Sequence, residues 1–181
     1  MQNDKGYTYV VDNRNDSVIE NAGDSGVDLV LSSVSFNLQS NVEALTLTGD
    51  GANNAVGNQG NNTLRGNDNA NFLVGSTGAD IMYGNGGDDG YDVDNVGDQA
   101  IESDNYQLFI DNAIRTNYDR VQSSVTFQLG ANIEELTLTG TAAIDGTGND
   151  IDNRITGNGA ANVLDGGAGT DTLVGGLGND T

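Results

Sequence analysis

Two blocks of this sequence repeat with a period of nine residues, and this period constrains the fold more than any other feature. The first block, from residue 57, reads GNQGNNTLR, GNDNANFLV, GSTGADIMY and GNGGDDGYD. The second, from residue 148, reads GNDIDNRIT, GNGAANVLD, GGAGTDTLV and GGLGNDT. Glycine opens each unit, Asn or Asp holds its sixth place, and an apolar residue usually holds its eighth. Such a period predicts small units that stack on one another.

Each nonapeptide has the composition of a turn followed by a short strand. Gly and Asn form tight turns and adopt positive φ at low cost, so the first six residues are expected to turn. The last three residues form a minimal strand whose middle side chain points inward. Two units then make one coil, and successive coils stack as parallel strands. The sequence predicts an all-β fold, a right-handed parallel β-roll or β-helix solenoid. Its inward ladder consists of Leu64, Leu73, Met82, Tyr91, Ile155, Leu164 and Leu173.

A longer repeat encloses the two blocks. The segment 32–49 returns as 123–140, at an offset of 91, whereas YVVDN at Tyr9 returns as YDVDN at Tyr91, at an offset of 82. The difference of nine indicates an insertion around 106–115 in the second copy, which we expect to be a short helix or a loop. We therefore expect two solenoid units, residues 1–90 and 91–181, with nonapeptide blocks at 57–90 and 148–181. The β-branched segments between the blocks are expected to form longer rungs of the same solenoid.

The charge of the chain points to a cationic partner. The net charge is -21, from 27 acidic and 6 basic residues. Such a chain repels itself, nucleic acid and anionic membrane surfaces. A solubilising acidic surface is the alternative explanation. Only 35% of the residues are hydrophobic, against about 45–50% in an ordinary domain, so the core is expected to be thin.

The absence of Cys and His limits the chemistry of any site. There is no disulfide, no thiolate, and no Ser–His or Cys–His pair for nucleophilic catalysis. Transition metals lack their usual ligands, so a hard cation bound by oxygen atoms is favoured. The first residues do not have the pattern of a secretory signal, and no stretch is long enough to span a bilayer.

The second block resembles the RTX (repeats-in-toxin) family. GGAGTDTLV and GGLGNDT match the nonapeptide G-G-x-G-x-D-x-U-x, and GSTGADIMY and GNGGDDGYD are imperfect versions. The resemblance implies that Ca²⁺ is the ligand. In that family the glycine-rich turn donates carbonyl oxygens, the sixth-position Asp donates a carboxylate, and each ion lies between turns one coil apart. Calcium accepts such irregular sets of oxygen ligands.

Carried over to this chain, the resemblance implies four calcium sites. They pair turn 57–62 with 75–80, 66–71 with 84–89, 148–153 with 166–171, and 157–162 with 175–180. The implied ligand residues are Gly75, Gly78, Asp80, Gly84, Gly87, Asp89, Gly166, Gly167, Gly169, Asp171, Gly175, Gly176, Gly178 and Asp180, together with Asn62, Asn71, Asn153 and Asn162.

In every pair the first turn departs from the family, because it has Asn where the family has Asp. Each site then loses one charge, and weaker binding is expected. Asp68, Asp88, Asp150 and Asp152 are candidates to compensate. Alternatively, the four Asn side chains form amide ladders that satisfy the turns without metal.

The resemblance implies a calcium-triggered structural module rather than an enzyme. Its relatives are secreted bacterial proteins, found outside the cell or on its surface, that pass unfolded through type I secretion. The chain reads as a segment of a longer protein or as a stacking unit. A self-assembling filament, joined head to tail through the solenoid ends, is one alternative. Two others are an accessory module of a carbohydrate-acting enzyme and an ice binder. The six scattered basic residues and the two TLT triplets give these little support.

Overall fold

The fold consists of short strands joined by turns. The computed structural model describes residues 5–22, 26–103, 108–110, 113–115 and 117–181. Within these ranges every regular element is a β-strand. None of the described segments is a helix of the kind that spans a bilayer.

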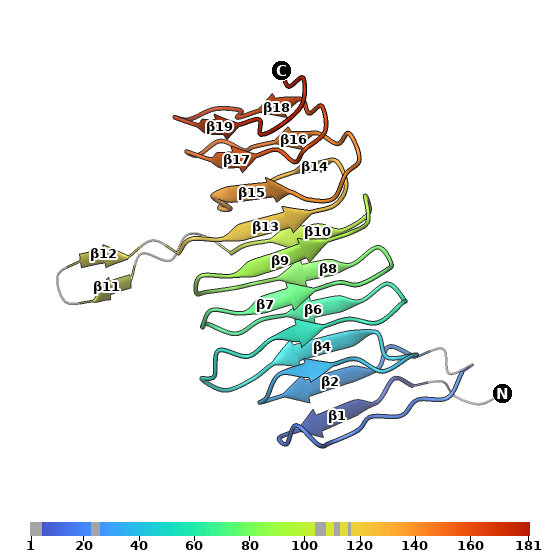
Figure 1. Ribbon diagram of the computed structural model, residues 1–181. Helices are drawn as coiled ribbons and strands as arrows, with labels where there is room; N and C mark the ends of the chain where they lie inside the picture. Colours follow the sequence, from blue (N-terminus) through green and yellow to red (C-terminus); the bar gives the residue numbers. More distant parts are fainter. Residues whose placement is uncertain (1–4, 23–25, 104–107, 111–112, 116) are drawn as a thin grey trace.

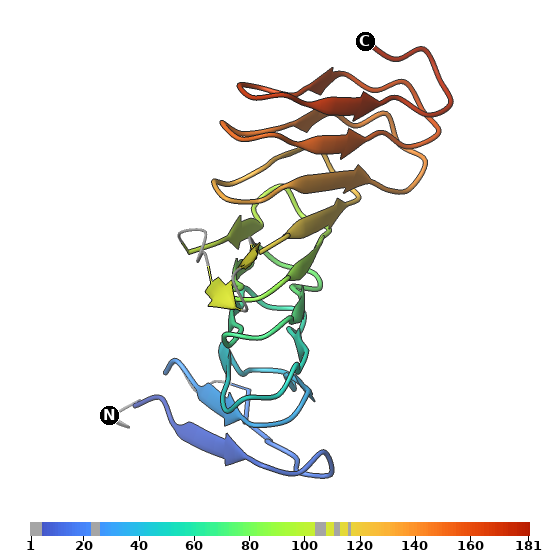
Figure 2. The ribbon, with the colours of Figure 1, turned by 90° about the vertical axis from the view of Figure 1, so that its left-hand side faces the viewer.

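The strands form a parallel β-solenoid (Figure 1). The first sheet has the order β1 (Thr8–Val11), β2 (Leu29–Ser32), β4 (Ala44–Leu47), β6 (Thr63–Arg65), β8 (Ile81–Tyr83) and β10 (Gln99–Ile101). The second has the order β19 (Thr172–Val174), β17 (Arg154–Thr156), β15 (Glu135–Leu138), β13 (Arg120–Ser123), β9 (Gly90–Val93), β7 (Phe72–Val74), β5 (Ala55–Val56) and β3 (Phe36–Asn37). A third sheet has the order β14 (Phe127–Gln128), β16 (Gly146–Thr147) and β18 (Leu164–Asp165). Consecutive strands from β3 to β10 alternate between the first two sheets, so each pair of strands closes one coil (Figure 2).

The register of the strands gives the length of each coil. In the nonapeptide blocks Thr63 pairs with Ile81 and Arg154 pairs with Thr172, so one coil contains two nonapeptides. Outside the blocks the coils differ in length, since Leu29 of β2 pairs with Thr8 on one side but with the nearer Ala44 on the other. The segments outside the blocks therefore continue the same stack with rungs of up to four residues.

The core is a single column of apolar side chains between the two faces. Leu64, Leu73, Met82, Tyr91 and Ile155 have no exposed surface. The other two members of the expected ladder lie near the end of the stack, where Leu164 is partly buried and Leu173 is 46% exposed. Because each three-residue strand β6, β7 and β8 buries only its middle side chain, a chain with few hydrophobic residues can fill this core.

The insertion of the second copy is neither a helix nor a simple loop. It contains an antiparallel hairpin of β11 (Leu108–Ile110) and β12 (Ala113–Arg115), which projects from the stack (Figure 1). Of the segment 106–115, residues 106, 107, 111 and 112 lie outside the described residues. The expectation of a helix is wrong, because Leu108–Ile110 and Ala113–Arg115 pair as strands.

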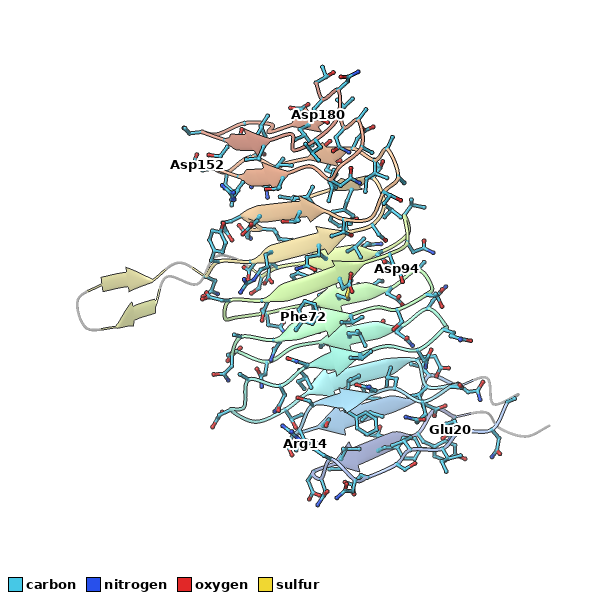
Figure 3. The ribbon with its side chains drawn as sticks, in the orientation of Figure 1. Arg14, Glu20, Phe72, Asp94, Asp152 and Asp180 are labelled. Carbon is cyan, nitrogen blue, oxygen red and sulfur yellow. The ribbon has the colours of Figure 1, made fainter. Side chains whose placement is uncertain are left out.

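The two copies of the long repeat differ in phase by half a coil, so equivalent strands lie in opposite sheets. In the first copy β2, β4 and β6 belong to the first sheet, whereas their equivalents β13, β15 and β17 belong to the second. One unit thus contains an odd number of half-coils. As a consequence, turns that correspond in sequence lie at opposite edges of the solenoid. Figure 3 shows Asp152 at one edge, and Asp94 and Asp180 at the other.

Candidate metal sites

The turns of the nonapeptides lie at the edges of the solenoid, where the chain passes between sheets. Turn 75–80 connects β7 to β8 and lies one coil after turn 57–62, because Thr63 pairs with Ile81. The same register stacks 84–89 on 66–71, 166–171 on 148–153, and 175–180 on 157–162. The structure therefore brings together the two turns of each expected pair.

The first turn of each pair is closed by its Asn side chain. The Asn62 Oδ1 accepts a hydrogen bond from the Asn58 N–H at 2.7 Å, and its Nδ2 donates to the Val42 carbonyl at 3.0 Å. Asn71, Asn153 and Asn162 make the same two kinds of bond. These amides satisfy the backbone of their own turn and of the preceding coil without a metal, as the amide-ladder alternative requires. One lone pair of each Oδ1 is left for a further contact.

The second turn of each pair uses only one oxygen of its Asp. The Asp80 Oδ1 accepts the N–H of Asn62, one coil earlier, at 2.7 Å. Asp89, Asp171 and Asp180 accept the N–H of Asn71, Asn153 and Asn162 in the same way, at 2.7, 2.9 and 3.0 Å. The Asp80 Oδ2 folds back over the opening glycine of the turn, where a Cβ at Gly75 would lie 2.5 Å from it. Only glycine fits beneath this carboxylate.

Two of these carboxylates carry an oxygen that has no partner. Among the described residues, Asp80 and Asp89 are fully buried, and the Oδ2 of each forms no hydrogen bond. A buried charged oxygen without a partner is costly, so such atoms in proteins normally contact a cation or an ordered water. Each pair of turns also holds two neutral oxygens, the Asn Oδ1 of the first turn and the carbonyl oxygen of the glycine that opens the second turn. Both lie close to the Cα of the glycine that opens the first turn, on the side where a side chain would be. Carboxylate, amide and carbonyl oxygens are the ligands that Ca²⁺ takes.

Burial perturbs both of these carboxyl groups. It raises the pKa of Asp80 to about 6; the hydrogen bond from Asn62 opposes the shift, and the charges of Asp98 and Asp94 add to it. Burial likewise raises the pKa of Asp89 to about 7; the bond from Asn71 opposes this shift, and Asp119 and Asp88 add to it. In both cases loss of water is the largest cause. The charged form therefore needs a compensating cation.

The backbone distinguishes the two kinds of turn. The Asp turns have positive φ at their fourth residue, at Gly78, Gly87, Gly169 and Gly178. They also have it at their second residue, at Ser76, Asn85, Gly167 and Gly176. In the four Asn turns, which the structure describes in full, no residue has positive φ. At Gly78, with φ of 135°, a Cβ would lie 2.5 Å from the Gly60 carbonyl oxygen of the turn below. Glycine at this place allows one turn to lie directly on the next.

The ladder of side chains continues beyond the nonapeptides, which the sequence reasoning missed. The Asp80 N–H donates to Asp98 Oδ1 at 2.9 Å, and the Asp89 N–H donates to Asp119 Oδ1 at 2.7 Å. Both acceptors are nearly fully buried. A step of two nonapeptides from Asp80 leads to Asp98 and could have found it. Asp119 lies farther along the chain from Asp89 than one ordinary coil, because the insertion lengthens that coil.

Of the four Asp residues considered as compensating ligands, two accept hydrogen bonds from backbone N–H groups of a neighbouring coil. Asp88 Oδ1 accepts the Tyr118 N–H at 3.0 Å, and Asp152 Oδ1 accepts the Thr170 N–H at 2.7 Å, both in exposed positions. These fifth-position side chains form an outer ladder. The carboxylates that lie next to the paired turns are instead those of the sixth-position Asp residues, together with Asp98 and Asp119, which continue their ladder.

A parallel β-solenoid whose edges carry stacked Gly–Asx turns with buried carboxylates is a repeat module built to hold cations. The sequence profile of the RTX calcium-binding nonapeptide repeat matches the chain in four copies, over residues 47–73, 65–99 and 146–181. These residues carry RTX calcium-binding nonapeptide repeats, and the protein contains a calcium-binding structural module. The comparisons with curated proteins and with solved structures found no match.

Proposed function

We propose that this chain is a calcium-dependent folding module of a secreted bacterial protein. The observation that carries the proposal is the pair of buried carboxylate oxygens, Asp80 Oδ2 and Asp89 Oδ2, that have no partner. They lie in a chain whose net charge is -21. Without a cation this charge opposes the compact state, and the buried oxygens add to the cost. Calcium bound at the four pairs of turns would give the buried oxygens a partner and would offset part of the net charge.

The expected free energy is large enough to decide whether the chain folds. Extracellular calcium modules have Kd values of roughly 10⁻⁴–10⁻³ M. At a free calcium concentration of ten times Kd, each site stabilises the fold by about 1.4 kcal/mol, and four sites by about 6 kcal/mol. This is comparable to the whole stability of a small domain. At micromolar calcium the contribution is close to zero, which would keep the chain unfolded inside a cell and let it fold outside. Passage through type I secretion is part of this proposal.

A calcium titration followed by far-UV circular dichroism tests the proposal. In EGTA we expect a largely disordered spectrum, and in millimolar calcium a β-rich spectrum. Magnesium is the control and should substitute poorly, because it requires a compact octahedral set of ligands. An identical β-rich spectrum in EGTA and in calcium would contradict calcium-dependent folding.

A second candidate function is head-to-tail assembly into a calcium-dependent filament or surface layer. One observation favours it: the start of the first strand is bonded to the next coil as the end of turn 84–89 is. The Tyr7 N–H donates to Asp28 Oδ1 at 2.6 Å, as the Asp89 N–H does to Asp119 Oδ1. Residues 175–180 correspond to 84–89 at the offset of 91. The first strand of one chain could then follow the turn 175–180 of another.

Sedimentation tests this assembly. Exposed apolar side chains mark the contact, including Leu177 at 77% and Val10 at 76%. If the rotation between subunits does not close a ring, the contact produces a filament. We expect larger species in millimolar calcium than in EGTA, and their loss when residues 175–181 are deleted. Strict monomers at high protein concentration in calcium would exclude assembly, and assembly that survives the deletion would exclude this interface.

A further inference from the structure

Three carboxylates meet where the first nonapeptide block joins the segment that follows it. Asp89 immediately precedes β9, Glu102 immediately follows β10, and Asp119 immediately precedes β13. One carboxylate oxygen of each lies within 4.8 Å of the others. Asp89 has no exposed surface, Asp119 is 2% exposed, and Glu102 is partly buried. Among the described residues, no Arg or Lys forms an ion pair with any of the three.

The hydrogen bonds around the cluster fix its geometry but leave one buried oxygen, Asp89 Oδ2, without a partner. Asp119 Oδ1 accepts the Asp89 N–H at 2.7 Å, and the Asp119 N–H donates to Glu134 Oε2 at 2.8 Å. The Tyr91 hydroxyl donates to Glu102 Oε1. The Asp89 Oδ1 is occupied by the Asn71 N–H. The Asp89 Oδ2 is buried, has no partner, and belongs to this cluster.

The oxygens converge on the bare face of Gly84. A Cβ at this position would overlap Asp89 Oδ2, Glu102 Oε1 and Tyr91 Oη. The Asp89 and Glu102 carboxylates are therefore directed at one small region, and a carboxylate oxygen of Asp119 lies within 4.8 Å of theirs. Without a cation, three such charged carboxylates repel one another. Burial, with the neighbouring carboxylates adding to it, raises the pKa of Glu102 to about 9, and the hydrogen bond from Tyr91 opposes this shift.

We propose that Asp89, Glu102 and Asp119 bind an additional calcium ion at the base of the inserted hairpin. This site shares Asp89 with the second pair of turns and adds Glu102 and Asp119, which lie outside the nonapeptides. The β11–β12 hairpin lies between Glu102 and Asp119 in the chain, so the ion would tie together the two ends of this segment. An all-oxygen set of carboxylates, in a chain without Cys or His, favours a hard cation such as Ca²⁺. The proposal rests on the proposed function in taking calcium as the ligand and in sharing Asp89.

The experiment counts bound ions in variants that keep the fold. Glu102→Gln keeps the size and hydrogen-bonding capacity of the side chain but removes its charge. Calcium binding to the full chain is measured by isothermal titration calorimetry, at concentrations where the protein is monomeric. We expect this variant to lose one ion from the wild-type stoichiometry, or to bind that ion at least tenfold more weakly. Its circular dichroism spectrum in saturating calcium should be unchanged.

The first copy of the repeat supplies a matched control. Glu20 is equivalent to Glu102 at the offset of 82, and its carboxylate likewise accepts a hydrogen bond from a tyrosine, Tyr9. At the same offset the position of Asp89 is taken by Tyr7, and among the described residues Glu20 belongs to no cluster of three carboxylates. The Glu20→Gln variant should therefore keep every ion. Loss of an ion in Glu20→Gln would show that a Tyr–Glu pair binds calcium alone and would overturn the proposal.

A second variant separates this site from general destabilisation. Asp119→Asn should lose the same ion, and combining it with Glu102→Gln should remove no further ion. If Glu102→Gln fails to fold, the ion count of Asp119→Asn decides the question. Wild-type stoichiometry and affinity in either folded variant would overturn the proposal. A wild-type chain that binds no calcium would instead refute the proposed function itself.

Discussion

The two nonapeptide blocks have the same architecture but bury their acidic residues to different degrees. In the first block Asp80 and Asp89 have no exposed surface, and each has one oxygen without a partner. In the second block Asp171 is only partly buried and Asp180 is exposed. Yet GGAGTDTLV and GGLGNDT match the family pattern, whereas GSTGADIMY and GNGGDDGYD depart from it.

The difference shows that agreement with the nonapeptide pattern and burial of the carboxylate are separate properties. The pattern indicates which turns are suited to bind an ion. The neighbouring coils decide how costly the empty turn is, because they remove water from the carboxylate. In the first block the coils of Asp98 and Asp119 follow directly and supply this burial. We therefore expect the first block to depend more strongly on calcium than the second.

The largest effect should come from pH in calcium-free solution. The pKa values of Asp80, Asp89 and Asp119 are raised, mainly by burial, to about 6, 7 and 7. Between about pH 4 and 7 the folded state then binds more protons than the unfolded state, so its stability falls as the pH rises through this window. Below about pH 4 the stabilisation is fully present.

The folded fraction in EGTA, followed by circular dichroism as the pH is lowered from 8 to 4, measures this effect, and hydrogen exchange assigns it to the first block. In saturating calcium the trend should reverse, because the ion competes with protons for the same carboxylates. A calcium-free stability that rises between pH 4 and 7 would contradict the role given to these carboxylates.

Gly78→Ala should cost about 3 kcal/mol of unfolding free energy, from a strained φ and an overlap with the turn below. Gly78 has φ of 135°, and its Cβ would lie 2.5 Å from the Gly60 carbonyl oxygen. Gly159→Ala is the control, because Gly159 has normal φ and no atom within 4 Å of an added Cβ. Its effect should stay within about 0.5 kcal/mol. Equal effects in thermal unfolding with calcium would show that the turns are not stacked as described.

Asp80→Asn should change stability in opposite directions with and without calcium. In excess calcium the variant should lose about 1.4 kcal/mol, the contribution of one site at ten times Kd. In EGTA at pH 8 it should be more stable than the wild type, since it removes a buried charge without a partner. Asp180→Asn should show the loss in calcium but no gain in EGTA, because Asp180 is exposed. A gain of stability in EGTA in both variants would show that the two blocks do not differ in the cost of an empty turn.

The smallest expected difference lies within the second block. Asp171→Ala should weaken calcium binding, by about 1 kcal/mol, whereas Asp152→Ala should change it by less than about 0.5 kcal/mol. Asp171 holds the sixth place of its turn and accepts the Asn153 N–H, but Asp152 belongs to the outer ladder. Isothermal titration of the two variants compares them. A larger loss for Asp152→Ala would place the ions on the outside of the turns.

Much of the fold could be predicted from local spacing. The nine-residue period predicts a coil of two units, and Thr63 and Ile81 pair at that distance. The eighth-position residues predict the core, as the burial of Leu64 and Met82 shows. Leu173 departs from this rule because β19 is the edge strand of its sheet. The division into units 1–90 and 91–181 stays a prediction.

What the sequence did not reveal depends on contacts between coils of unequal length. Asp119 lies beside Asp89 only because the coil that carries the insertion returns to the same edge. The odd number of half-coils in a unit sets Asp80 and Asp171 at opposite edges, which no single motif indicates. The unpartnered oxygen of Asp89 likewise depends on burial by that longer coil, so the order of calcium dependence between the blocks could not be read from the consensus.

Hydrogen exchange of the two blocks during a calcium titration tests the central claim most directly. We expect both blocks to exchange freely in EGTA at pH 7.5 and to become protected as the calcium concentration rises. Protection of residues 63–93 should increase by more than that of residues 154–174. Protection of both blocks in EGTA equal to that in calcium would contradict calcium-dependent folding of this chain.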